Sequence, residues 1–135
     1  MPRTARPYTL KEIDMGYRSD VAAVFYTKDA EQWGALRLFV DENFPDTLRG
    51  ELEPIGSIRY CGYKLSLTDT KWYDGHDEVK AFNAFVSRYK ELADEVPWQY
   101  EFIRIGEDAD DIEEDINGTD VGNVLRVERS IECDF

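Results

Sequence analysis

The apolar and polar positions of the chain divide it into segments with the periods of strands and helices. The run from Val21 to Tyr26 is continuously apolar, which is typical of a strand buried on both faces. Strict alternation at residues 63–68 predicts a half-buried strand, preceded by a tight turn or bulge at Cys61-Gly62. Further strands are predicted at residues 58–60, 98–105 and 125–131.

Two segments show the helical period instead. Apolar residues recur at helical spacing between Trp33 and Phe44, and Asp29 is expected to cap the start of that helix. Residues 45–56 contain two prolines and two glycines and predict a loop. A second helix is expected to begin at a cap formed by Asp74 or Asp77. Its apolar stripe consists of Val79, Phe82, Val86, Tyr89 and Ala93.

The resulting order, β-α-β-β-α-β-β, predicts the α+β class. It fits a ferredoxin-like, split β-α-β plan with a mainly antiparallel sheet and two helices on one face. We expect an extra C-terminal strand, residues 125–131, to pair with residues 98–105 through the acidic segment between them. Residues 15–135 are expected to form this single domain. Residues 1–14 lack a periodic apolar pattern and are expected to form a flexible N-terminal arm.

The charge of the chain narrows the classes of partner. Its 135 residues include 29 acidic and 16 basic side chains, which give a net charge of −13. Such a chain is not expected to bind nucleic acid or an anionic membrane surface, because phosphate binding depends on Lys and Arg. The longest apolar run, residues 21–26, is too short to span a bilayer, and the N-terminus lacks a secretory signal. We therefore expect a cytoplasmic protein.

The acidic residues concentrate near the C-terminus, where eight carboxylates and no basic residue lie between positions 107 and 120. A dense group of carboxylates attracts basic protein surfaces. We therefore identify these eight residues as a candidate acidic binding surface, with solubility as the alternative role. They are Glu107, Asp108, Asp110, Asp111, Glu113, Glu114, Asp115 and Asp120.

Catalytic and metal-binding patterns are incomplete. Residues 113–118 match the first half of a calcium loop, but the twelfth position, where a bidentate Glu is needed, is Val124. His76, between Asp74 and Asp77, could serve as a general base, although a polar turn residue at a helix start is the favoured interpretation. We predict no cofactor, no metal site and no enzyme. A small divalent-metal-dependent enzyme is an alternative.

Three motifs together resemble those of small proteins encoded by tailed bacteriophages and prophages. They are Met15-Gly-Tyr-Arg-Ser-Asp-Val21, residues 71–79 (KWYDGHDEV) and residues 100–112 (YEFIRIGEDADDI). The resemblance covers most of residues 15–135 and excludes residues 1–14. It implies an intracellular phage protein that acts in an infected or lysogenised bacterium, and it assigns no functional residues.

Charge and resemblance together predict an acidic protein-interaction module that binds a host or phage protein with a basic surface. The most specific version of this prediction is a protein that inhibits a host DNA-binding or defence protein by DNA mimicry. Closely spaced carboxylates could compete with duplex DNA, which carries a charge about every 1.7 Å, for the same Lys and Arg side chains. A phage structural or assembly protein is an alternative, including a homodimer formed through an exposed edge strand.

Overall fold

The computed structural model describes residues 17–57, 59–108, 110–117, 125–127 and 131–133, so the expected arm at residues 1–14 lies outside the described part. The elements along the chain are β1 (Ser19–Thr27), the 3-10 turn η2 (Ala30–Gln32), α2 (Trp33–Asn43), α3 (Asp46–Arg49), β2 (Leu52–Gly56), β3 (Cys61–Thr70), α4 (Asp77–Ala93), β4 (Trp98–Gly106), β5 (Ile112–Asn117), β6 (Leu125–Val127) and β7 (Ile131–Cys133).

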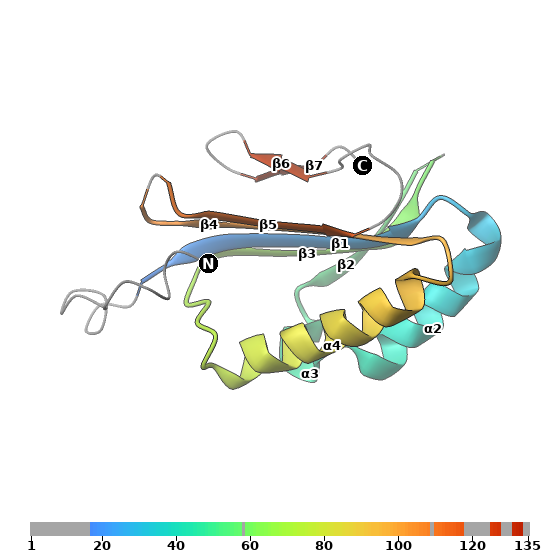
Figure 1. Cartoon of the computed structure of the whole chain (residues 1–135), viewed down its shortest axis with the longest axis horizontal. Coiled ribbons are helices and arrows are strands. Elements are labelled where there is room, and N and C mark those ends of the chain that lie inside the picture. Colours follow the sequence, from blue (N-terminus) through green and yellow to red (C-terminus); the bar gives the residue numbers. More distant parts are fainter. Residues whose placement is uncertain (1–16, 58, 109, 118–124, 128–130, 134–135) are drawn as a thin grey trace.

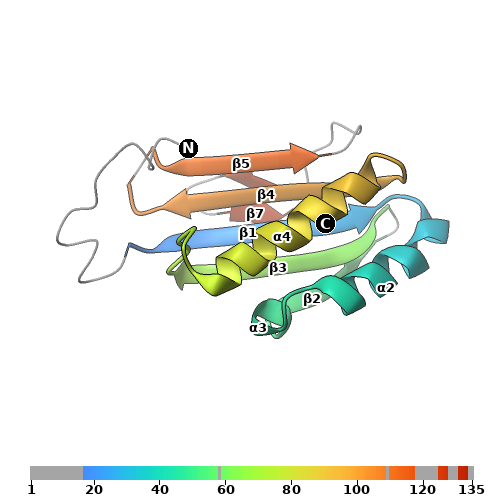
Figure 2. The ribbon, with the colours of Figure 1, turned by 60° about the horizontal axis from the view of Figure 1, so that its bottom comes forward.

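Five strands form one open sheet in the order β2-β3-β1-β4-β5, and every neighbouring pair is antiparallel (Figure 2). The chain contains two β-α-β units, β1-α2-β2 and β3-α4-β4. β3 lies between the two strands of the first unit, and β1 lies between the two strands of the second, so each unit is split by a strand of the other. This arrangement confirms the predicted α+β class and the split β-α-β plan with one strand added at the edge.

The identity of the added strand was predicted wrongly. β5 is made from the acidic segment itself, and it pairs with β4 from Ile105↔Ile112 to Tyr100↔Asn117. Residues 125–127 and 131–133 form a separate two-stranded sheet, not one strand at 125–131. An edge strand is paired on one side only, and all six positions of β5 are at least partly exposed, so its carboxylates can remain hydrated.

The three helices α2, α3 and α4 cover one face of the sheet, which we call the helix face (Figure 1). Phe25 of β1 lies at the centre of the core on this face. Its ring contacts those of five other aromatic residues at centroid distances of 5.2–6.2 Å: Phe44, Phe82, Phe85, Tyr89 and Tyr100. Each buried ring of this size contributes about 1.5–3 kcal/mol through burial, and edge-to-face packing adds to it.

The helices begin and end largely as their sequences predict. The Asp29 carboxylate caps η2 by accepting the Glu31 N–H at 2.9 Å, and α2 ends at Asn43, before Pro45. The predicted stripe of α4 is buried at four positions and half-buried at Ala93. The predicted cap of α4 is wrong: His76 occupies the N-cap position, and its side chain makes no capping hydrogen bond.

The region between the two long helices also departs from the prediction. Residues 45–56 contain α3 and β2 in place of a loop, and the strand predicted at residues 58–60 is absent from the described positions 59 and 60. Gly62 lies within β3 and forms no turn. A Cβ at this position would lie 2.3 Å from the Phe25 carbonyl oxygen and 2.5 Å from the Tyr26 Cβ, so glycine permits the close approach of β3 to β1.

The second face of the sheet, opposite the helices, has its own apolar cluster. It contains Ala22, Val24, Tyr26, Tyr60, Ile103 and Leu125. Leu125 belongs to β6, and the β6-β7 sheet lies over this face (Figure 1). The buried Glu101 carboxylate accepts hydrogen bonds from the Tyr26 hydroxyl at 2.6 Å and from the Leu125 N–H at 2.8 Å. β6 is therefore attached to the sheet by a polar contact as well as by apolar packing.

Candidate functional site

The candidate acidic surface is built on β5 and on the turn at residues 107–111. The register with β4 pairs Glu113 with Arg104 and Asp115 with Phe102, so these two carboxylates project on the helix face. Glu114 pairs with Ile103 and projects on the second face. The alternation of the strand therefore divides the acidic residues between opposite sides of the sheet.

Arg104 organises the helix-face side of this segment. Its side chain is only 3% exposed, and its Nη2 lies 2.8 Å from Asp111 Oδ1. Its Nη1 donates to Asp111 Oδ2 at 3.2 Å and to Ser19 Oγ at 3.1 Å, while its Nε donates to Glu113 Oε1 at 3.1 Å. Burial lowers the pKa of Arg104, but the hydrogen bonds to Asp111 and Glu113 outweigh it and raise the pKa above the ordinary value.

The turn that precedes β5 is closed by internal hydrogen bonds. The Tyr17 hydroxyl donates to Asp111 Oδ2 at 2.7 Å and accepts the Asp108 N–H at 3.0 Å. The Gly106 N–H donates to the Asp111 carbonyl oxygen at 2.8 Å. A Cβ at Gly106 would lie 2.2 Å from Asp111 Oδ2, so a side chain there would displace the carboxylate. Burial is the main cause that raises the pKa of Tyr17. Asp111 is thus a structural residue of the turn.

The eight predicted binding residues consequently have different environments. Asp111 is 7% exposed and paired with Arg104, which corrects its assignment to an exposed surface. Glu113 and Asp115 are half-buried and form ion pairs, the latter with Lys90 of α4 at 2.6 Å. The carboxylate of Glu107 accepts the Arg18 N–H at 2.6 Å. Exposed positions include Glu107, Asp108, Asp110 and Glu114, whereas Asp120 lies outside the described residues.

Sequence reasoning missed two apolar members of the edge. Ile112 and Ile116 are 43% and 44% exposed, although they are large hydrophobic residues. They share the second face with Glu114, because residues two apart on a strand project on the same side. Their spacing of four positions was the available signal, and the assumption of a connecting loop concealed it. The exposed side of β5 therefore alternates apolar, acidic and apolar side chains.

The other candidate chemistry has little structural support within the described part of the chain. His76 is exposed, and its ring lies 4.9 Å from that of Tyr73. Among the described residues, no three His, Cys, Asp or Glu side chains are grouped so that they could hold a metal ion. In the same part of the chain, none of the helices combines the length and apolar character needed to cross a membrane.

Comparison of this chain with protein-family models, curated proteins and solved structures finds no match.

Proposed function

We propose that the protein is an acidic protein-interaction module that binds a basic segment or surface of a partner protein at β5. The observation that carries this proposal is the exposed, alternating edge of the sheet formed by Ile112, Glu114 and Ile116. β5 pairs with β4, and no other described strand pairs with it. The free backbone edge of such a strand can accept another strand.

The charge of β5 favours a basic partner over a second copy of the chain. If two β5 strands paired in antiparallel orientation, the acidic run Glu113–Asp115 would face its own copy, and like charges directly opposite each other are destabilising. A strand or loop with Lys or Arg would place opposite charges there instead. The net charge of −13 would also attract such a partner over a distance that salt shortens.

The general form of this function has more support than DNA mimicry. A mimic must leave its carboxylates available to the lysines and arginines of the partner, whereas Asp111, Glu113 and Asp115 already form ion pairs within the chain. Glu114 and Asp110 remain exposed. The resemblance to phage proteins would make the partner a host or phage protein within a bacterial cell.

The test is affinity capture from bacterial lysate, in which the chain is compared with two charge-reversal variants. Glu114→Lys changes the exposed side of β5, whereas Glu42→Lys makes the same change of net charge on the exposed surface of α2. We expect Glu114→Lys to weaken capture of the specific partner about tenfold or more, because it replaces an attraction by a repulsion. Glu42→Lys should leave capture unchanged.

Two further measurements complete this test. Capture should weaken as the salt concentration rises, because the contact is electrostatic. Release of the partner by duplex DNA would support the mimicry form, and retention in its presence would support the general form. Equal capture of the same partner by the wild-type chain and by Glu114→Lys would contradict the proposal.

A further inference from the structure

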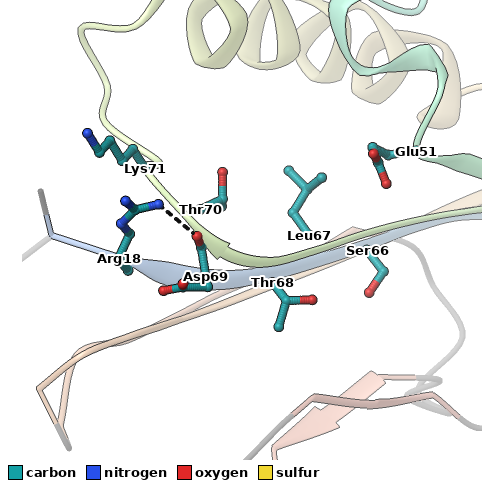
Figure 3. A pocket seen from close by; sticks show the side chains of 8 residues that line it. All are labelled: Arg18, Glu51, Ser66, Leu67, Thr68, Asp69, Thr70 and Lys71. Carbon is teal, nitrogen blue, oxygen red and sulfur yellow. Dashed lines mark hydrogen bonds between the residues drawn. The ribbon is translucent and has the colours of Figure 1, made fainter.

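A second open edge of the sheet lies on the opposite side, along the second half of β3. β2 pairs with β3 only from Cys61 to Leu65, so no described strand covers the outer edge of residues 66–70. A groove of about 360 Å³ follows this edge, and its lining includes every residue from Ser66 to Thr70 (Figure 3). β1 pairs with the inner side of the same segment, which holds it in the sheet.

The groove contains an irregularity of the backbone that the neighbouring residues maintain. Asp69 has a φ of 53°, in the left-handed region that few non-glycine residues adopt, and the register of β1 with β3 shifts beside it. The Asp69 N–H donates to Asp20 Oδ1 at 2.9 Å, and its carbonyl oxygen accepts from Arg18 Nη1 at 3.1 Å. These bonds fix Arg18 at one end of the groove.

Both basic residues that line the groove lie at one end, together with the acidic Asp69, and the acidic Glu51 lies at the other end (Figure 3). Arg18 and Lys71 lie together beyond Thr70, and Glu51 lies at the other end, near Ser66 (Figure 3). Lys71 is exposed, and no described residue forms an ion pair with its ammonium group. Between the ends, the hydroxyls of Ser66 and Thr68 and the half-buried side chain of Leu67 provide polar and apolar contacts.

We propose that this groove binds a short extended peptide segment that adds a strand to β3 and places its C-terminal carboxylate between Arg18 and Lys71. The backbone edge would supply main-chain hydrogen bonds, as in other cases of strand addition. The direction follows from the charges. A segment parallel to β3 brings its carboxylate to the two cations and its amino-terminal part to Glu51, whereas an antiparallel segment would reverse both interactions.

This site lies at the opposite edge of the sheet from β5 (Figure 2), and its one link to the candidate acidic surface is the Arg18 N–H, which donates to Glu107. The two sites would bind different groups: the groove would bind a free peptide carboxylate, whereas β5 would bind a basic protein surface. A peptide with a blocked C-terminus should bind poorly here, because the neutral amide loses its attraction to both cations.

The probe is a pool of short synthetic peptides with free C-terminal carboxylates, compared with the same pool after C-terminal amidation. Binding to the whole chain is followed by NMR and by amide hydrogen exchange, and the affinity of enriched peptides is then measured by calorimetry. We expect binding about tenfold tighter for the free acids, with protection at residues 66–70. Lys71→Gln should remove most of this preference, while Lys80→Gln on the exposed surface of α4 should retain it.

Three outcomes would overturn the proposal. Equal affinity for the free-acid and amidated peptides would remove the role of Arg18 and Lys71. Protection at β5 and none at residues 66–70 would assign binding to the other edge. A dimer in light scattering, together with protection of residues 66–70 in the absence of peptide, would make a second copy of the chain the occupant.

Discussion

Replacement of Asp111 tests whether the buried ion pair with Arg104 holds the end of the sheet together. Asp111→Leu removes the acceptor of two guanidinium hydrogen bonds, at 2.8 and 3.2 Å, and of the Tyr17 hydroxyl. Breaking a buried pair typically costs about 3–5 kcal/mol, because the remaining charge is left uncompensated. We expect about 3 kcal/mol, at the lower end, because Glu113 and Ser19 still accept hydrogen bonds from Arg104.

The same experiment includes a second variant that removes both charges of the buried pair. Arg104→Met combined with Asp111→Leu replaces the pair with apolar side chains, an exchange that is often close to neutral. We expect the double variant to recover most of the stability lost by Asp111→Leu. A control, Glu114→Gln, changes an exposed carboxylate on the same segment and should alter stability by less than about 0.5 kcal/mol.

The assay is equilibrium unfolding in urea, followed by tryptophan fluorescence, with the free energies of unfolding compared at equal m-values. A loss below about 1 kcal/mol for Asp111→Leu would refute the reasoning, because it would mean that Arg104 is not committed to this carboxylate. A double variant that is less stable than Asp111→Leu would refute it as well, since the cost could not then come from an unpaired charge.

Three further predictions concern other parts of the core. Gly62→Ala should lower the urea midpoint by the equivalent of about 1–3 kcal/mol, because its Cβ would meet backbone atoms of β1, whereas the matched change Gly34→Ala, which has open space on α2, should raise it. Burial raises the pKa of Tyr89 well above 10, so the contribution of this residue to stability should be constant below pH 10 and should fall above it as Tyr89 ionises in the unfolded chain. The fall is about 1.4 kcal/mol per pH unit for this residue, and Tyr89→Phe should make it shallower in unfolding experiments. Glu101→Ala should accelerate hydrogen exchange at the Leu125 amide, which donates to that carboxylate; unchanged exchange would mean that packing alone holds β6.

The parts of the fold that sequence predicts well are those in which the buried positions of an element repeat with a regular period or form an unbroken run. α4 packs on one side only, so its apolar stripe repeats at the helical period from Val79 to Tyr89. β1 is covered on both faces, so residues 21–26 are continuously apolar. Together with the order of the other predicted elements, these two patterns predict the split β-α-β plan.

The edges of the sheet could not be predicted in the same way. β2 and β5 lie at the two edges, where no position of either strand is fully buried, so the apolar alternation that marks a strand is weak. β2 also contains Pro54, which edge strands tolerate and which suggested a loop. The acidic candidate site was only partly predictable for a related reason: the burial of Asp111 depends on Arg104 and Tyr17, which are distant from it in sequence or lie on another strand.

The central position of β1 determines the order in which the chain can complete its fold. β1 is the first described strand, yet its neighbours are β3 and β4, which follow much later in the sequence. Contacts of such long range slow folding, because a large loop must close before they form. Until β4 is synthesised, one side of the apolar run Val21–Tyr26 has no strand beside it and is open to association with other chains. The pairing of β4 with β1 is therefore the step that closes the longest apolar run of the chain against such association.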